Sequence, residues 1–408
     1  MSQSLRNPTE GMVGSSGNFV KIENKGAAMN TFWSRTILNH AIVAMAVMLL
    51  LVAPIVGAQT ITEIIDGTGD GSGNTLINPT GIAVDGSGNI FVAGNTSHNA
   101  FKITPGGAIT EIIDASGDNL GNILEIARFV AVDESGNVFV LGNVSNNVFK
   151  ITPGGVITEI IDTNGDGAGN ILMVPREVTV DGSGVVYVTG WGSRNVFKIS
   201  PGGVVTEIFD DSEHNFMGTW GVAVDGFENV YVTGNYSNNA YKITPGGVVT
   251  QIINGGDGLL APQGIALDGS GNVFVAGKDS YNVFKITPGG VITEIIDVTG
   301  DGGGNALSGP EHLAVDNAGN VYVTSSPNSK AFKITPGGVI TQIIDASGDG
   351  QGHTFSFPEG MAVDKSGNAF VTAWGTDNAF EIQGPMIFKD GFESADTTAW
   401  SSSVPAQP

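Results

Sequence analysis

Cysteine is absent from the 408 residues of this chain, and only 17 residues are Lys or Arg, against 40 Asp or Glu. The lack of cysteine excludes disulfide bonds, which a chain with room for a large core does not need. The formal net charge of −23 argues against nucleic acids and anionic lipids as partners, because both are bound through basic groups. We therefore expect no nucleic-acid partner, and cations or neutral molecules are the natural ligands of so acidic a chain.

The residue types that are present indicate a folded, turn-rich β protein. Glycine accounts for 61 residues, 41% of the chain is apolar, and only 14% is charged. Because Val, Ile and Phe recur throughout the sequence, this composition favours an all-β fold over a disordered chain.

Residues 1–58 do not share the pattern of the rest of the chain. The nearly unbroken apolar run 41–57 leads into a small-residue pattern typical of signal peptidase cleavage sites. We predict a signal peptide with an over-extended start, Met29 being the candidate true start, that is cleaved between Ala58 and Gln59. The protein is then secreted, periplasmic or at the cell surface. In the alternative, an uncleaved N-terminal anchor would be its contact with the membrane.

The rest of the chain is built from one repeat. The stretch Phe101–Asp114 reads Phe-Lys-Ile-Thr-Pro-Gly-Gly-Ala-Ile-Thr-Glu-Ile-Ile-Asp. Near-copies begin 43 to 48 residues apart, at Phe149, Phe197, Tyr241, Phe284, Phe332 and, in degenerate form, Phe380. A period of this length is typical of propellers and solenoids.

Each period contains four apolar segments, which in the first complete copy are 81–85, 89–93, 100–104 and 108–114. Short β-rich segments separated by Gly, Pro and Asn turns predict a four-stranded antiparallel meander, which is one blade of a β-propeller.

Counting the copies predicts how the ring closes. The first segment of the period occurs seven times, and so does the fourth, but the earliest fourth segment, 60–66, precedes every first segment. We therefore predict an all-β, seven-bladed propeller over residues 59–385, in which strand 60–66 completes the last blade. Residues 386–408 break the period and are expected to form a frayed tail or a sorting segment.

Two motifs resemble known propeller sequences. The run Gly81–Val92, Gly-Ile-Ala-Val-Asp-x-x-Gly-Asn-Ile-Phe-Val, resembles the NHL repeat of β-propellers. Its pairing with Ile-Thr-Pro-Gly-Gly-x-Ile-Thr-Glu resembles the seven-bladed streptogramin lyase (virginiamycin B lyase) group, over nearly all of the chain after residue 58. The resemblance implies the seven-bladed fold.

For a lyase of this group, the resemblance also implies a His and Glu constellation in the funnel with a divalent metal. Blades of the group tend to read Pro-His-x-Ile before the first strand and Phe-Thr-Glu at the end of the second. The nearest match here, Pro310–Leu313, places His312 one position late, and the second strands end without Glu. No catalytic residue is therefore transferred from the family.

Five long connections between blades resemble the first half of a calcium-binding loop, with oxygen ligands at positions one, three and five and Gly at six. Counted from Asp162, the Glu expected at position twelve falls on Met173, and Asp and Gly also suit tight turns. Structural turns and weak sites for Ca²⁺ or another divalent metal thus stay open as alternatives. The candidate ligands are Asp66, Asp70, Asp114, Asp118, Asp162, Asn164, Asp166, Asp297, Asp301, Asp345 and Asp349.

A second set of candidates comes from residues that interrupt the repeat, since the repeat does not need them. The chain after residue 58 contains three Arg, and two of them begin the first segments of adjacent blades. Because a guanidinium binds carboxylate or phosphate bidentately, we predict a ligand site at the axial funnel. The alternative is that these Arg pair with neighbours such as Glu177 or Glu125. The predicted site residues are Arg128, Arg176, Glu177, Trp191, Arg194, Trp220, Glu311, His312 and Glu359.

Three functional classes fit this fold: a streptogramin lyase-like enzyme, a gluconolactonase-like metal hydrolase, and a non-catalytic binding propeller. Glu311, His312 and Glu359 could supply part of a metal hydrolase site. The third class requires nothing that the sequence lacks. The sequence thus favours an exported bacterial propeller, monomeric and non-catalytic, that binds a small-molecule, glycan or protein ligand, with a metal-dependent propeller enzyme as the alternative.

Overall fold

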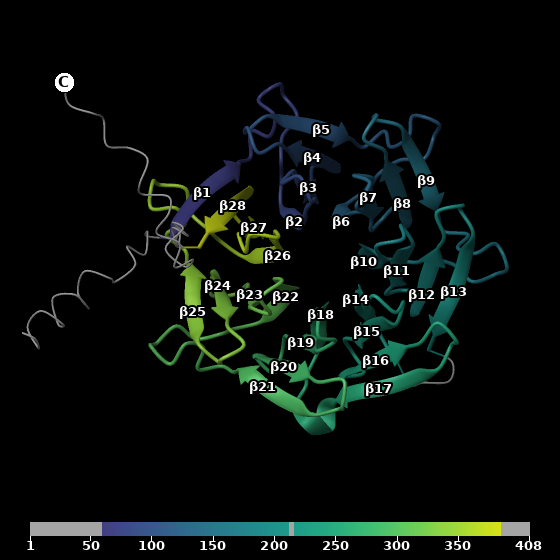
Figure 1. The fold of residues 1–408 in the computed structure, drawn as a ribbon. Coiled ribbons are helices and arrows are strands. Elements are labelled where there is room, and N and C mark those ends of the chain that lie inside the picture. The colour runs from purple at the N-terminus through teal and green to yellow at the C-terminus, as the bar shows by residue number, and fades with distance from the viewer. Residues whose placement is uncertain (1–58, 212–215, 385–408) are drawn as a thin grey trace, which may run out of the picture. The chain divides into compact units, whose positions relative to one another are not determined.

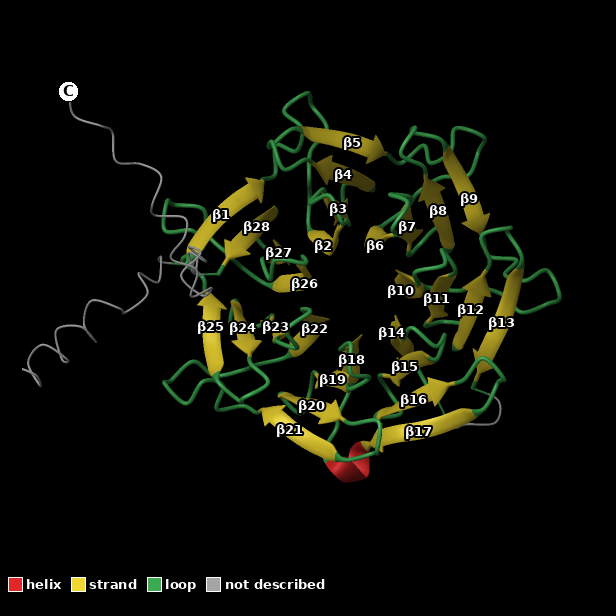
Figure 2. Cartoon of the chain, in the orientation of Figure 1, coloured by secondary structure: helices red, strands yellow, loops and turns green. Residues whose placement is uncertain are grey.

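A computed structural model describes residues 59–211 and 216–384, and this part of the chain forms seven four-stranded antiparallel sheets around one axis (Figure 1). The innermost strands surround the axis, and the outermost strands lie at the perimeter. Within these residues the only helical element is one 3-10 turn, η1 (Gly255–Asp257), drawn in red in Figure 2. No helix of the described residues is long and apolar enough to cross a membrane.

From the axis outward, the strands are β2 (Pro79–Val84), β3 (Ile90–Gly94), β4 (Asn99–Ile103) and β5 (Ile109–Ile113) in blade 1; β6 (Ala127–Val132), β7 (Val138–Gly142), β8 (Asn147–Ile151) and β9 (Ile157–Ile161) in blade 2; β10 (Pro175–Val180), β11 (Val186–Gly190), β12 (Asn195–Ile199) and β13 (Val205–Asp210) in blade 3; β14 (Thr219–Val224), β15 (Val230–Gly234), β16 (Asn239–Ile243) and β17 (Val249–Asn254) in blade 4; β18 (Pro262–Leu267), β19 (Val273–Gly277), β20 (Asn282–Ile286) and β21 (Ile292–Ile296) in blade 5; β22 (Pro310–Val315), β23 (Val321–Ser325), β24 (Lys330–Ile334) and β25 (Ile340–Ile344) in blade 6; and β26 (Pro358–Val363), β27 (Ala369–Ala373), β28 (Asn378–Gln383) and β1 (Thr60–Ile65) in blade 7.

The last blade confirms the predicted closure. Strand β1 pairs antiparallel with β28, so that Thr60 lies opposite Gln383 and Ile61 opposite Ile382. The first described strand therefore supplies the outer strand of blade 7 and joins both ends of the repeat in one sheet. The predicted signal peptide, its cleavage site and the C-terminal tail lie outside the described residues.

The core lies between neighbouring blades. All five residues of each second strand are buried, because both faces of these strands are covered by adjacent sheets. Phe91 of blade 1, for example, packs in one cluster with Val138 and Phe149 of blade 2. Full burial of one such side chain stabilises the fold by about 1.5–3 kcal/mol.

Glycine allows the inner strands of several blades to approach each other. A Cβ added to Gly81 would lie 2.7 Å from the Cα of Phe129, and at Gly221, Gly264 and Gly360 it would meet the next blade's backbone at under 3.0 Å. The three other blades carry large side chains at this position, namely Phe129, Glu177 and His312. These three therefore sit where the packing of the blades does not require glycine.

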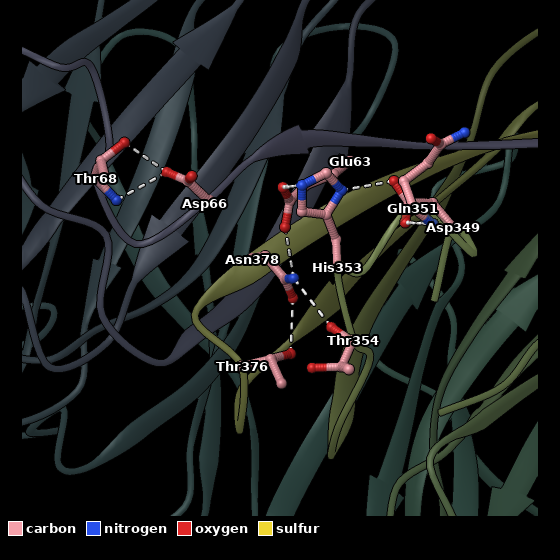
Figure 3. A network of polar contacts seen from close by, with 9 residues as sticks. All are labelled: Glu63, Asp66, Thr68, Asp349, Gln351, His353, Thr354, Thr376 and Asn378. Carbon is pink, nitrogen blue, oxygen red and sulfur yellow. Dashed lines mark hydrogen bonds and ion pairs between the residues drawn. The ribbon is translucent and has the colours of Figure 1, made fainter. Parts of the chain in front are cut away.

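A polar network fastens the closing blade (Figure 3). The Nδ2 of Asn378 on β28 donates to Oε1 of Glu63 on β1, at 2.7 Å. His353, from the connection between blades 6 and 7, contacts Asp349 through Nδ1 (2.6 Å) and Glu63 through Nε2 (3.5 Å). The N-terminal strand is thus held by side chains as well as by its ladder of backbone bonds.

Candidate functional site

Two rings of side chains meet at one end of the axis. One ring is formed by the second residue of each inner strand. The other is formed by the residue that follows each second strand. They lie at the same end because the hairpins are antiparallel, as the pairing of Pro79 with Gly94 shows. We call this end the funnel site. Apart from threonine, serine and amide side chains, its members are Arg128, Arg176, Trp191, Trp220, Lys278, Glu311, Glu359 and Trp374.

Arginine and tryptophan side chains form one cluster on blades 2, 3 and 4. The Cζ of Arg176 lies 4.5 Å from the ring centroid of Trp220 and 5.0 Å from that of Trp191. The Cζ of Arg128 lies 5.4 Å from the Trp220 centroid, so Trp220 contacts both guanidinium groups. Tyr236 extends the aromatic surface, since its ring centroid lies 5.7 Å from that of Trp191. The structure thus brings together four of the predicted site residues.

Arg176 has no acidic partner within ion-pair distance among the described residues. Its buried Nε donates no hydrogen bond, and the buried Nε1 of Trp191 likewise has no partner. Burial, and secondly the charge of Arg128, lower the pKa of Arg176 to about 10, so the group stays protonated at neutral pH. The Arg176 guanidinium and the neighbouring indole of Trp191 therefore each have a buried N–H group without an acceptor.

The other half of the funnel site holds ion pairs. The Nζ of Lys278 lies 2.7 Å from Oε1 of Glu311, and an Nη of Arg128 lies 4.0 Å from Oε2 of Glu359. Arg128 thus pairs with Glu359 on blade 7 and with neither Glu125 nor Glu177, the neighbours considered from the sequence. Burial, ahead of the opposing charge of Arg128, raises the pKa of Glu359.

Two buried titratable groups lie just below this layer. Burial raises the pKa of Glu177 well above its usual value, although the Val222 N–H donates to the carboxyl group. Burial, and then the charges of Arg128 and Lys278, lower the pKa of His312 to about 3. Its ring packs 5.3 Å from that of Phe129. His312 is therefore uncharged at neutral pH.

The funnel site carries a net charge opposite in sign to that of the whole chain. Three cations, Arg128, Arg176 and Lys278, face two carboxylates, Glu311 and Glu359, which leaves one net positive charge in a chain of net charge −23. A site with one excess positive charge and aromatic walls is suited to a monoanion with a flat apolar part.

The predictions from sequence missed Lys278 and included a residue that lies apart from the cluster. Lys278 follows Gly277 at the position that Trp191 occupies in blade 3, so comparing the copies at that position would have found it. Arg194 instead forms an exposed ion pair with Asp211, at 3.0 Å.

The Asp- and Gly-rich connections fold as hydrogen-bonded turns. In the first of them, Oδ1 of Asp70 accepts from the Ser72 N–H at 2.8 Å, and Oδ2 accepts from Nδ2 of Asn74 at 2.8 Å. The same side-chain pair recurs as Asp118 with Asn122, Asp166 with Asn170, and Asp301 with Asn305. These bonds occupy the carboxylates that were candidates for calcium, and binding of Ca²⁺ stays a prediction.

The residues of the funnel site do not fit the divalent metal that the resemblance to lyases implies. Within residues 59–211 and 216–384, no group of three or more His, Asp or Glu side chains is arranged to hold a metal ion. Glu311 and Glu359 face cations, and His312 is buried between positive charges. We therefore derive no chemistry through a metal.

Two family models match short parts of the chain. Residues 68–102 match the model of a β-propeller repeat, and residues 303–326 match that of the N-terminal part of strictosidine synthase-like proteins. None of the curated proteins matches the chain.

Solved structures with a similar fold include two lyases and a lactonase. Virginiamycin B lyase from Staphylococcus aureus superposes with a TM-score of 0.63 at 17% identity, over 80% of this chain and 99% of the lyase. A streptogramin B lyase superposes with a TM-score of 0.65 at 15% identity, over 80% of this chain and 98% of the lyase. A gluconolactonase from Xanthomonas campestris superposes with a TM-score of 0.50 at 13% identity, over 82% of this chain and 93% of the lactonase. At such identities the likeness concerns the fold alone, and the chain is a seven-bladed β-propeller with the fold of virginiamycin B lyase.

Proposed function

We propose that this protein is an exported, non-catalytic propeller whose funnel site binds a small monoanion, a carboxylate or phosphate that carries a flat apolar group. One observation carries the proposal: the guanidinium of Arg176 lies between Trp191 and Trp220 without an acidic partner. It stands beside a second guanidinium, that of Arg128.

The energetics of a buried cation support this proposal. A partly buried guanidinium without a counter-ion loses hydration, and a second cation beside it adds repulsion. Both costs fall when an anion accepts hydrogen bonds from the guanidinium. Groups held in an unfavourable state in this way are typical of binding sites.

The rim of the funnel site supplies the flat surface. Tyr236 is 62% exposed and packs at a tilt of 54° against Trp191, and Trp374 is 40% exposed on blade 7. Aromatic side chains of this kind bind planar groups through stacking and burial of apolar area. An anion anchored on Arg176 could therefore place its ring against Trp191 and Tyr236.

Lyase or lactonase chemistry has no support among the described residues. The similar lyases and the lactonase share the fold, and a propeller fold hosts many functions. The carboxylates Glu311 and Glu359 face the cations Lys278 and Arg128.

The test is a titration of intrinsic tryptophan fluorescence with benzoate, phenyl phosphate, acetate and inorganic phosphate. We expect saturable changes with the two aromatic anions and weaker binding of acetate and phosphate. Arg176→Gln should weaken benzoate binding about tenfold to a hundredfold, the effect of losing a charge-assisted hydrogen bond. Arg194→Gln is the matched control, since Arg194 pairs with Asp211 and should leave affinity unchanged.

Two results would overturn the proposal. One is the absence of saturable binding for every probe. The other is equal benzoate affinity in Arg176→Gln and the wild type, with both proteins folded by circular dichroism. Turnover of a probe by the wild type would instead contradict the non-catalytic assignment.

A further inference from the structure

Exposed apolar side chains border the funnel site on blades 3 and 4. Met173 is 41% exposed and Met217 is 39% exposed, and each lies in the connection that precedes an inner strand. The Gly192 N–H donates to the carbonyl of Met173 at 2.9 Å, which places this methionine beside the loop of Trp191. The Tyr236 N–H donates to the carbonyl of Met217 at 3.1 Å. We call Met173, Met217 and Tyr236 the apolar rim.

The apolar rim is continuous with the cluster of arginine and tryptophan. The ring of Tyr236 packs 5.7 Å from that of Trp191. Gly218 makes this contact possible, because a Cβ added there would lie 3.0 Å from the ring of Tyr236 and 3.3 Å from Nε1 of Trp191. Exposed methionine adapts to partners of different shape, and exposed apolar patches are typical of surfaces that bind other chains.

The guanidinium of Arg176 can be reached by a ligand on this surface. The side chain is partly exposed, and among the described residues no atom accepts a hydrogen bond from either Nη group. The nitrogen that is buried without a partner is Nε alone, so both Nη groups are free to donate. A carboxylate accepts two parallel bonds from such a pair of donors. The carboxylate at the end of a polypeptide chain is a monoanion of this kind.

Acidic side chains lie in the same connections as the two methionines. Asp162 and Asp166 precede Met173, and Asp211 precedes Met217. The whole chain has a net charge of −23, whereas the funnel site has one excess positive charge. A ligand that is negative at its end and positive along the residues before it is complementary to both charges.

We propose that the funnel site binds the C-terminus of a peptide or protein chain. The terminal carboxylate accepts hydrogen bonds from Arg176, and the last side chain is aromatic and packs on Trp191 and Tyr236. The residues before it are basic or apolar and lie over Met173 and Met217. This inference rests on the proposed function, since it names the kind of molecule that carries the bound anion.

The experiment is calorimetric titration with the N-acetylated pentapeptide Lys-Val-Lys-Val-Phe, with its C-terminal amide, and with N-acetylphenylalanine. We expect the free acid to bind at least about tenfold more tightly than the amide, the effect of one charge-assisted hydrogen bond. Arg176→Gln should remove this difference. The pentapeptide should also bind about tenfold more tightly than N-acetylphenylalanine, because its longer chain covers the apolar rim.

A double variant, Met173→Ser with Met217→Ser, tests the rim itself. It should lower the affinity for the pentapeptide about fivefold and narrow its advantage over N-acetylphenylalanine. Val204→Ser is the matched control and should leave both affinities unchanged. Val204 is 64% exposed in the turn between β12 and β13, at the end of the blade opposite the funnel.

Equal affinity for the free acid and the amide would overturn the inference, as would a preference for the acid that persists in Arg176→Gln. A pentapeptide that binds no more tightly than N-acetylphenylalanine would overturn it as well. Benzoate separates this inference from the proposed function. Saturable binding of benzoate without binding of the pentapeptide refutes the peptide ligand and leaves the anion site standing, whereas loss of both refutes the anion site too.

Discussion

His353 Nε2 lies 3.5 Å from Oε2 of Glu63, so the connection between blades 6 and 7 contacts the strand that closes the ring (Figure 3). In four other connections the corresponding residue is Asn, which bonds to a single Asp of its own loop. Among these five connections, the one with a titratable group at this position is the one that contacts the closing strand.

The first prediction concerns pH. The hydrogen bond to Asp349, and secondly the charge of Glu63, raise the pKa of His353. A pKa raised in the folded state gives stabilisation that is fully present below the unfolded value, about 6.5, and is lost as pH rises through the folded pKa. We therefore expect Tm to fall between pH 6 and pH 8 by more in the wild type than in His353→Asn.

His353→Asn introduces the residue that four other connections have at this position, so the variant should fold normally. The difference between the two proteins isolates His353 from His312, whose lowered pKa acts with the opposite sign at lower pH. An identical pH dependence of Tm in both proteins would exclude the contact with Glu63 as a source of stability.

The second prediction tests the close approach of the inner strands of blades 7 and 1. Gly360→Ala places a Cβ within 3.0 Å of the backbone oxygen of Thr80, across the boundary between blades 7 and 1. We expect the free energy of unfolding to fall by about 1–3 kcal/mol, the usual cost of overpacking. Gly86→Ala, whose Cβ would meet only the end of the flexible Lys365 side chain, should change it by less than about 0.5 kcal/mol. Urea unfolding of the two variants measures both values, and equal stability would contradict the packing argument.

The third prediction concerns the Asp- and Gly-rich connections. Their carboxylates accept hydrogen bonds from their own loops, and Oδ1 of Asp166 accepts from the Ala168 N–H at 2.9 Å. We therefore expect the same Tm in excess Ca²⁺ and in excess chelator, and a loss of about 1 kcal/mol on Asp166→Ala, the typical value for a side chain that caps backbone N–H groups. A rise of several degrees with Ca²⁺ would show that these loops bind metal.

The fold could be predicted from the sequence because the pattern of one blade recurs along the chain. Seven copies of one period gave the blade count, and the early segment 60–66 gave the closure by β1. The contacts of single residues were harder to predict. Arg128 and Trp220 were found because they break the repeat, but the pairing of Arg128 with Glu359 depends on the curvature of the ring, which brings blade 2 near blade 7. Arg194 was included in the predicted site because it is close to Trp191 in the sequence. In the structure its backbone has a φ of 61° and its side chain pairs with Asp211.

The last prediction uses Glu359 to test the charge balance of the funnel site. Its carboxylate lies 4.0 Å from Arg128 and thereby competes with an anionic ligand for that cation. Glu359→Gln removes the competing charge and keeps a side chain of similar shape, so it should strengthen anion binding. We expect a severalfold gain in affinity, about the value of one partly screened charge interaction at this distance.

The same carboxylate predicts how anion binding depends on pH. Because burial raises the pKa of Glu359, this group takes up a proton as pH falls through a range where exposed glutamates are still ionised. Affinity of the wild type for benzenesulfonate, a probe that stays ionised in acid, should therefore rise as the pH is lowered toward 5, and Glu359→Gln should show a flat profile. Fluorescence titrations of both proteins between pH 5 and pH 8 decide the matter. A flat profile in the wild type, or the same slope in both, would mean that Glu359 does not oppose the bound anion.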